Sequence, residues 1–216
     1  MARAATYLLA LALASGFVDA ASYLALGRVF TANMTGNTVL LGVAVATGSG
    51  GEAARAGAAL AGFCVGVAAG VALIRGAGGS WPMSARLTFV LEIAALTALL
   101  VAWTAIGVPS FRYGLIALSG FAMGTQSAAV RAARAGGIAT TYVTGTLTNA
   151  IGRAVEHARG TAESAQGAGL AGGVWVTYAV GALGGAALER AWHGAVIAVP
   201  LAIVCAVAAV AALGRD

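Results

Sequence analysis

Charge is scarce in this sequence. Only 9% of the 216 residues are charged, and there is no lysine, so all 12 basic residues are arginine. A soluble domain carries about a quarter charged residues. The hydrophobic share is 60%, and several apolar stretches approach the roughly 20 residues that a helix needs to cross a bilayer. The composition therefore excludes an ordinary soluble fold and predicts an all-α, polytopic membrane helical bundle in contact with the lipid bilayer.

Residues typical of catalysis and metal binding are also few. The chain has two cysteines and two histidines. His157 and His193 lack the spacing to other ligands that a zinc site needs. No Ser/His/Asp or Cys/His arrangement stands out, so we expect no enzyme, no metal and no cofactor. The arginines are scattered singly rather than clustered, so we expect no nucleic-acid partner.

Eight apolar segments can be marked along the chain, and 1–216 forms a single predicted membrane domain. The segments lie at about 5–27, 31–47, 53–74, 85–107, 111–131, 138–157, 168–188 and 194–213. The first of them resembles a signal peptide, with Arg3 before an apolar run. We expect it to remain in the protein, because Ser15-Gly16-Phe17 belongs to an internal repeat.

The first four segments are similar in sequence to the last four. Three matches occur in the same order: Ser15-Gly16-Phe17 with Ser119-Gly120-Phe121, Thr35-Gly36 with Thr144-Gly145, and residues 57–62 with 167–172. Any one match between glycine-rich and alanine-rich segments is weak, but the shared order predicts a tandem duplication. The predicted repeats cover about 5–107 and 111–213.

The arginine distribution indicates how the repeats are oriented. If all eight segments cross the membrane, six arginines fall on each side. If segments 31–47 and 138–157 instead enter and return, eight fall on the side of the N-terminus, which obeys the positive-inside rule for a cytoplasmic N-terminus. The sequence therefore predicts two inverted repeats of three spans each, plus one broken or re-entrant segment per repeat. This is a layout of many secondary transporters, and we expect it in a bacterial inner (plasma) membrane.

The two non-crossing segments are rich in hydroxyl and amide side chains. Each holds a Thr-Gly pair, Thr35-Gly36 or Thr144-Gly145, and we predict that the helix breaks there, because glycine tolerates non-helical backbone. The freed amides and the helix dipole would attract an anion or a polar solute. The predicted solute-binding residues are Asn33, Thr35, Gly36, Asn37, Gln126, Thr144, Gly145, Thr146 and Asn149. The alternative is that these side chains only bond to neighbouring helices.

Asp19 is the one carboxylate deep inside the first segment. An ionised carboxylate there costs at least about 2.5 kcal/mol, so it should be paired, protonated or functional. Two roles stay open: uptake and release of a coupling proton, or a structural bond to Arg28 or to a backbone amide. Glu92 lies nearer a membrane face, and we expect it to pair with Arg86.

Gly62, Gly66 and Gly70 recur every four residues. Small residues at this spacing let helices approach closely. We expect this stripe to pack within the monomer, with a homodimer seam as the alternative.

Two stretches of the sequence resemble a known family. They are GFVDAASYLALGRVFTANMTGNTVLLG at 16–42 and AMGTQSAAVRAARAGGIATTYVTGTLTNAIG at 122–152. Both are similar to motifs of the YoaK-like family of bacterial inner-membrane proteins, and the similarity runs over nearly the whole chain. The resemblance implies a six-pass membrane protein and adds no substrate.

These observations together predict a small secondary transporter or channel for a small polar or anionic solute, with a proton coupled through Asp19. The alternative from another functional class is a non-transporting membrane scaffold or accessory subunit, in which the polar stretches only join helices.

Overall fold

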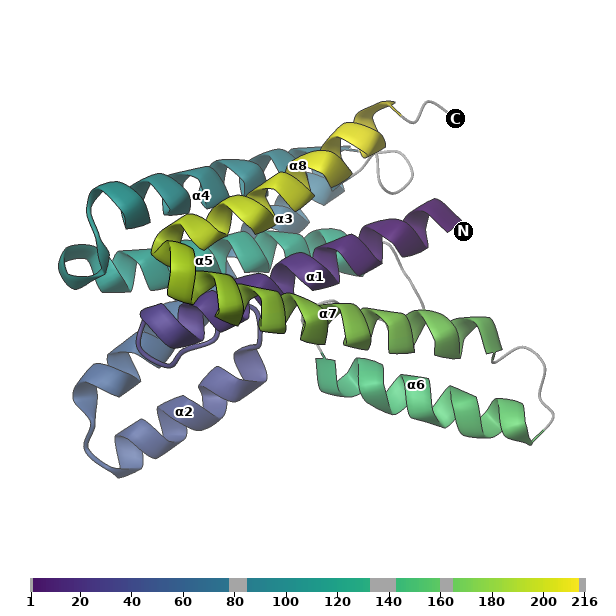
Figure 1. Ribbon diagram of the computed structural model, residues 1–216, viewed down its shortest axis with the longest axis horizontal. Coiled ribbons are helices and arrows are strands. Elements are labelled where there is room, and N and C mark those ends of the chain that lie inside the picture. Colours follow the sequence, from purple (N-terminus) through teal and green to yellow (C-terminus); the bar gives the residue numbers. More distant parts are fainter. Residues whose placement is uncertain (1, 78–84, 133–142, 160–164, 214–216) are drawn as a thin grey trace.

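The computed structural model describes residues 2–77, 85–132, 143–159 and 165–213. Within them the chain forms α-helices and one short 3-10 helix, with no strand (Figure 1). In chain order these are α1 (Ala2–Ala25), α2 (Met34–Ala46), α3 (Gly50–Ala77), α4 (Arg86–Ala105), α5 (Val108–Ala132), α6 (Val143–Ala158), α7 (Ala165–Trp192), η3 (His193–Ile197) and α8 (Ala198–Leu213). Each predicted segment overlaps one of the α-helices, so the all-α fold is confirmed.

Four stretches of the described chain are long and apolar enough to cross a membrane. They are Ala4–Ala25, Gly50–Arg75, Arg86–Ala105 and the 45-residue stretch Gly169–Leu213, which holds α7, η3 and α8. α5 has 25 residues but falls outside this set, and it carries the buried polar residues Ser119, Thr125 and Gln126. The number of six spans stays a prediction.

The helices pack in two groups of four. The most extensive contacts join α3 to α5 and α1 to α7. α2 packs on α3 and α4 on α5, which makes one group; α6 packs on α7 and α8 on α1, which makes the other. The groups meet where α4 contacts α8 and η3, and where α1 contacts α5. Each predicted repeat contributes helices to both groups.

The contacts keep their pattern when the two halves of the chain are exchanged. Replacing α1 by α5, α2 by α6, α3 by α7 and α4 by α8, and the reverse, turns the α1–α7 contact into the α5–α3 contact. The same exchange turns α2–α3 into α6–α7 and α4–α5 into α8–α1. In Figure 1, α1 and α5 run in opposite directions, as do α3 and α7. This pattern supports the inverted duplication, which itself stays a prediction.

Glycine permits the close approach in both main helix pairs. A Cβ added to Gly62 of α3 would lie 2.1 Å from the carbonyl oxygen of Ala117 in α5. A Cβ added to Gly181 of α7 would lie 2.1 Å from the carbonyl oxygen of Leu13 in α1. Any side chain at these positions would force the helix backbones apart. Gly66 behaves like Gly62, so the predicted packing of this stripe within the monomer is confirmed.

The glycine contacts correct one of the repeat matches. The sequence aligns residues 57–62 with 167–172, yet a Cβ on Gly172 would have nothing within 4 Å. In its contacts, Gly62 corresponds to Gly181. The connection from α6 to α7 is longer than that from α2 to α3. The difference in residue number that relates α1 to α5 therefore does not relate α3 to α7.

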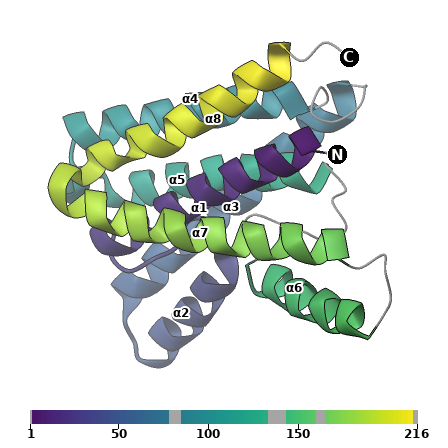
Figure 2. The same cartoon turned by 45° about the vertical axis from the view of Figure 1, so that its right-hand side comes forward.

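α2 and α6 are too short to cross a bilayer. They have 13 and 16 residues, or about 20 and 24 Å at 1.5 Å per residue, against a hydrocarbon core of about 30 Å. Both begin near the middle of the molecule and run toward opposite ends, with their N-terminal ends facing each other (Figures 1 and 2). Their lengths and directions fit the half-helices that the sequence predicts, and the two inverted repeats around them stay a prediction.

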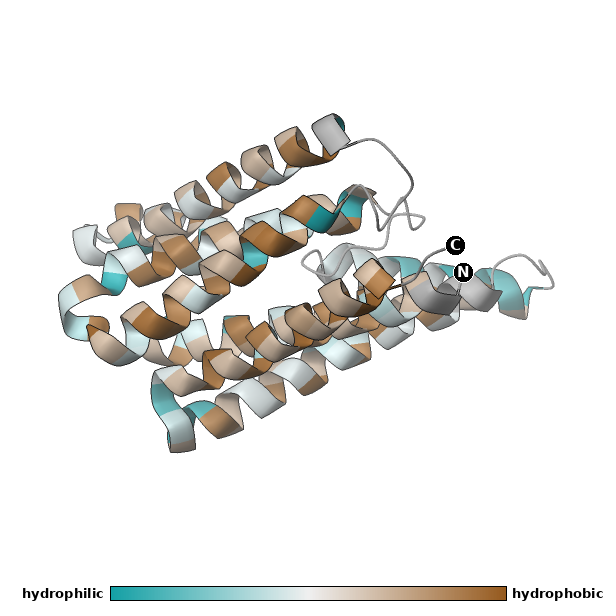
Figure 3. Ribbon diagram, turned by 90° about the horizontal axis from the view of Figure 1, so that it is seen from above, coloured by the Kyte–Doolittle hydropathy of each residue, from teal (hydrophilic) through white to brown (hydrophobic). Residues whose placement is uncertain are grey.

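The outside of the bundle is largely apolar. Val39 and Val45 of α2 are 62% and 67% exposed, and Leu183 of α7 is 73% exposed. Figure 3 shows apolar residues along most of the long helices, and hydrophilic ones near helix ends and along much of α6. An exposed apolar surface of this extent is typical of membrane contact.

The glycine contacts lead to a first prediction. Gly62→Ala should lower the free energy of unfolding by about 1–3 kcal/mol, because the added methyl group overpacks a backbone contact. The matched control is Gly57→Ala in the same helix, where an added Cβ would have nothing within 4 Å. Thermal unfolding of the protein in detergent micelles measures both. Equal melting temperatures for the two variants would show that the close approach is not required.

Candidate functional site

The carboxylate of Asp19, near the end of α1, is bound by the loop that follows this helix. Its Oδ1 accepts from the backbone N–H groups of Thr31 and Ala32, both at 2.7 Å, and its Oδ2 accepts from that of Asn33 at 3.0 Å. The Tyr178 hydroxyl of α7 donates to Oδ2 at 2.5 Å. A carboxylate only accepts hydrogen bonds, and four donors satisfy its two oxygens. The predicted structural bond to backbone amides is confirmed.

The loop reaches Asp19 because the chain reverses direction directly after α1. Gly27 and Arg28 have φ angles of 99° and 61°, a region that glycine enters without strain. Arg55 of α3 donates from Nε to the carbonyl oxygen of Gly27 at 3.1 Å. Arg28, the other predicted partner of Asp19, thus lies in the turn itself, and the donors to Asp19 are amides and Tyr178 instead.

Two asparagines then fix the start of α2. Asn33 is the N-cap, and its Oδ1 accepts from the backbone N–H of Gly36 at 3.4 Å. The side chain of Asn37 holds the backbone of Phe30 from both sides: Oδ1 accepts from its N–H at 3.0 Å, and Nδ2 donates to its carbonyl oxygen. A Cβ on Gly36 would lie 2.9 Å from the ring of Phe30. These predicted site residues therefore organise the helix start.

The first helix break lies before its Thr-Gly pair rather than at it. α2 begins at Met34 and α6 at Val143, so both pairs lie in the first turn of a helix. Residues 26–33 form the first break. Gly36 is required by its contact with Phe30 and not by non-helical backbone, which corrects the prediction. Thr140 and Thr141, part of the second polar stretch, lie outside the described residues.

Hydroxyl and amide side chains join α1 to α5 at two places. Thr31 Oγ1 shares a hydrogen bond with Ser22 Oγ at 2.9 Å and accepts from Ser119 Oγ at 2.8 Å. Gln126 Nε2 donates to Ser15 Oγ at 2.6 Å. Ser15 matches Ser119 in the predicted repeat, and at the same offset Ser22 matches Gln126. Exchanging the two halves therefore turns the contact of Ser22 and Ser119 into the contact of Gln126 and Ser15. Gln126 belongs to this helix contact and not to the start of α2.

The remaining predicted residues lie on α6. Thr144 is exposed, Gly145 and Asn149 are partly buried, and Thr146 is fully buried. Thr146 and Asn149 both take part in further interactions. The structure therefore places the predicted residues in three sets: one at the start of α2, one at the start of α6, and Gln126 between α1 and α5.

The bonds of Asp19 change the expected chemistry of the first half-helix. The sequence predicts free amides that attract an anion, but the amides of Thr31, Ala32 and Asn33 already bind the Asp19 carboxylate. The side chain of Asn33 also binds the amide of Gly36. The Asp19 carboxyl group thus occupies this end of α2, which corrects the prediction for the first half.

Tyr178 is the site residue that the sequence reasoning missed. It lies in the middle of an apolar helix, where a tyrosine usually only packs. The signal was present, because a buried tyrosine hydroxyl needs a hydrogen-bond partner and Asp19 is a buried carboxyl group that needs donors. The pairing joins residues 159 positions apart, and sequence spacing does not reveal such a contact.

The predicted ion pair of Glu92 with Arg86 is wrong. Nη2 of Arg86 donates to the carbonyl oxygen of Ala212 in α8 at 3.0 Å. Glu92 is 0% exposed, and neither of its carboxyl oxygens has a hydrogen-bond partner among the described residues.

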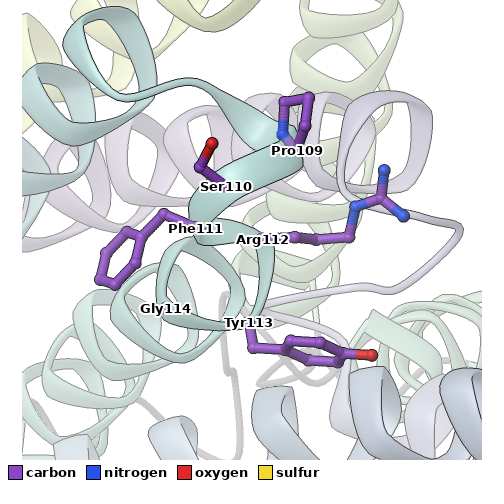
Figure 4. Close-up of a pocket in the computed structure, with 6 residues that line it drawn as sticks. All are labelled: Pro109, Ser110, Phe111, Arg112, Tyr113 and Gly114. Atoms are coloured by element: carbon purple, nitrogen blue, oxygen red, sulfur yellow. The ribbon is translucent and has the colours of Figure 1, made fainter.

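A pocket is present at the start of α5, away from these sets. It is lined by residues 109–114, where Phe111 interrupts the helix with φ −135° and ψ 24° (Figure 4). Figure 4 shows Arg112 and Tyr113 extending to one side of the segment and Phe111 to another. None of the predicted solute-binding residues lines this pocket.

Residues 7–211 match the family model described as "Protein of unknown function (DUF1275)". The chain belongs to this family. Over 152 residues it is 35% identical to the UPF0700 transmembrane protein YoaK of Bacillus subtilis (strain 168). The similar region covers 68% of this chain and 65% of the relative's length, and no solved structure matches. Together with the apolar helices, the relationship identifies a multi-pass membrane protein and confirms the YoaK-like resemblance.

The bonds of Asp19 give the second prediction. Asp19→Asn should speed hydrogen exchange at the amides of Thr31, Ala32 and Asn33, because asparagine offers one acceptor atom in place of two. A hydrogen bond to a charged group contributes about 1.5–3 kcal/mol, so the exchange rates should rise about tenfold or more. Hydrogen exchange with mass spectrometry on the protein in nanodiscs measures this.

The matched control is Thr38→Val, which removes an exposed hydroxyl bond to the carbonyl oxygen of Met34. This variant should leave the loop amides protected. Unchanged protection in folded Asp19→Asn would contradict the assignment of Asp19 to the loop.

Proposed function

We propose that this protein is a small secondary transporter or channel of a bacterial inner membrane, which moves a small polar solute between two inverted halves. The proposal rests on the two half-helices, α2 and α6, which start in the middle of the molecule and run to opposite ends (Figures 1 and 2). Non-helical backbone at membrane depth is tolerated where protein buries it or where it lines a water-filled cavity. Broken helices at a repeat interface carry the solute sites of many transporters.

The two helix groups are the parts proposed to move. Glycine contacts hold α3 to α5 in one group and α1 to α7 in the other. Contacts between the groups are fewer and lie at α1–α5, α4–α8 and α4–η3. Rocking of one group against the other around these contacts would open the middle to each side in turn.

Asp19 is proposed as a positioning residue in this movement. Asp19 and Tyr178 belong to one group, and the loop that Asp19 binds leads into α2 of the other group. The carboxylate thus ties the start of the first half-helix to the neighbouring group. The coupling of a proton through Asp19 stays a prediction, and the four donors around the carboxylate fit its ionised form.

The chemistry at the two half-helix starts favours an uncharged polar solute over an anion. Asp19 already occupies the amides before α2. The polar side chains at the two half-helix starts include the hydroxyls of Thr35 and Thr144 and the amides of Asn33 and Asn149. Hydroxyl and amide groups can both donate and accept hydrogen bonds. We therefore infer recognition through hydroxyl and amide groups.

The arginines support a cytoplasmic N-terminus. α1 begins, and α3, α5 and α6 end, at the same end of the molecule (Figure 1). The described arginines toward that end are Arg75, Arg86, Arg131, Arg153 and Arg159, with Arg3 in the first turn of α1. Those toward the opposite end are Arg28, Arg55, Arg112 and Arg190. The richer end is proposed to face the cytoplasm, following the positive-inside rule.

Cysteine labelling tests the transport proposal and gives the third prediction. In a variant without Cys64 and Cys205, Thr35→Cys and Thr144→Cys should each react with a membrane-impermeant thiol reagent, from opposite sides of sealed vesicles. The matched control is Val39→Cys, on the outer face of α2 and 62% exposed in the isolated protein, which should be shielded by lipid.

A solute path would be contradicted if neither cysteine variant reacts with the reagent from either side of the vesicles, while both react after the protein is dissolved in denaturant. That result would favour the membrane scaffold, in which the polar stretches only join helices.

A further inference from the structure

Glu92 is a fully buried carboxyl group that takes no part in the bonds around Asp19. It lies seven positions into α4, and its exposure is 0%. Both of its oxygens lack a hydrogen-bond partner among the described residues. Asp19, by contrast, has four donors. A buried charge is retained only when it is paired or hydrogen-bonded, so the surroundings of Glu92 do not fit an ionised carboxylate.

The hydroxyl of Thr88 lies one helical turn before Glu92 and is also fully buried without a partner among the described residues. This is unusual within α4 itself. Thr97 and Thr104 donate to the carbonyl oxygens one turn earlier, both at 2.8 Å. Residues four apart on a helix share a face, so Thr88 and Glu92 place three unpartnered oxygen atoms on the buried face of α4.

The helices packed on α4 are α3, α5, α8 and η3. Within the part of the chain that the structure describes, none of them gives Glu92 a charged partner. Arg86, on its own helix, bonds to Ala212. The other titratable or charged residues on these elements lie at helix ends or on exposed faces: Glu52, Arg55, Cys64 and Arg75 of α3, Arg112, Tyr113 and Arg131 of α5, Cys205 of α8, and His193 of η3.

From this geometry we propose that Glu92 and Thr88 form a buried proton-binding site. The bound proton neutralises the carboxyl group, and Thr88 is the hydroxyl placed to accept or donate beside it. Neither residue was part of the predicted solute site. An intramembrane ionisable residue of this kind is typical of proton relays in transporters.

The site is also placed to couple proton binding to movement. α4 belongs to one helix group and makes the main contacts of that group with α8 and η3 of the other. Loss of the proton would leave a buried charge on α4, the helix that carries these contacts. This second part of the inference, that Glu92 is the coupling residue, rests on the proposed function; the proton site itself does not.

Infrared spectroscopy of the protein in lipid vesicles tests the proton site and gives the fourth prediction. The wild type should show the C=O stretch of a protonated carboxyl group around neutral pH, and Glu92→Gln should remove it. The matched control is Glu52→Gln on α3, an exposed acidic residue, which should leave the band in place. Thr88→Val should shift the band, and Thr88→Ser, which keeps the hydroxyl, should not.

Absence of the band from the wild type, or its persistence in folded Glu92→Gln, overturns the proposal. The wild-type spectrum alone decides the first of these outcomes, whether or not the variant folds.

Proton movement in liposomes loaded with a pH-sensitive dye tests the coupling role. The wild type should conduct protons down an imposed gradient, and Glu92→Gln should lose this flux while Glu52→Gln keeps it. If the infrared band of Glu92 is present but the protein conducts no protons, the proton-binding site is supported and the coupling role of Glu92 is overturned. Thiol labelling of Thr35→Cys and Thr144→Cys separately decides the solute path.

Discussion

The bonding of one carboxylate by three consecutive backbone amides organises the first half of this bundle. A chain that leaves a helix inside the membrane exposes N–H groups that lipid cannot satisfy. Asp19 satisfies three of them at 2.7–3.0 Å. The same amides stabilise the carboxylate, which would be costly there if it were alone. Two groups that are each unfavourable in hydrocarbon thus stabilise one another, and the chain can begin α2 in the middle of the molecule.

Glycine provides the second constraint, because the position of Asp19 depends on how closely α1 lies to α7. Tyr178 of α7 donates to Asp19. A Cβ added to Gly16 of α1 would lie only 2.1 Å from the backbone carbonyl oxygen of Tyr178. Without a hydrophobic driving force between helices in lipid, such close packing supplies much of the association. The tight helix pair and the bound carboxylate therefore depend on each other.

Much of this architecture could be predicted from the sequence because the signals are local. Apolar runs separated by glycine and charge mark every helix, and the repeated motifs mark the half-helices α2 and α6. The sequence also placed Asp19 correctly as a residue that needs a partner. It could not identify Tyr178 as that partner, because the contact depends on which helix packs beside α1. For the same reason it paired Glu92 with the nearest arginine, although α8 offers Arg86 a carbonyl oxygen. The register of α7 was also misread, because glycine-rich sequence matches at several offsets.

The exchange of partners between the two halves has a consequence for biosynthesis. Among the described α-helices, α1 precedes its main partner α7 by five intervening helices, and α3 precedes its main partner α5. Neither half can complete its packing before most of the other has entered the membrane. The early helices must therefore reside in lipid with their glycine faces unpaired. Assembly therefore depends on contacts between helices distant in sequence, which form late and slowly. The first half does not complete its packing before the second half is inserted.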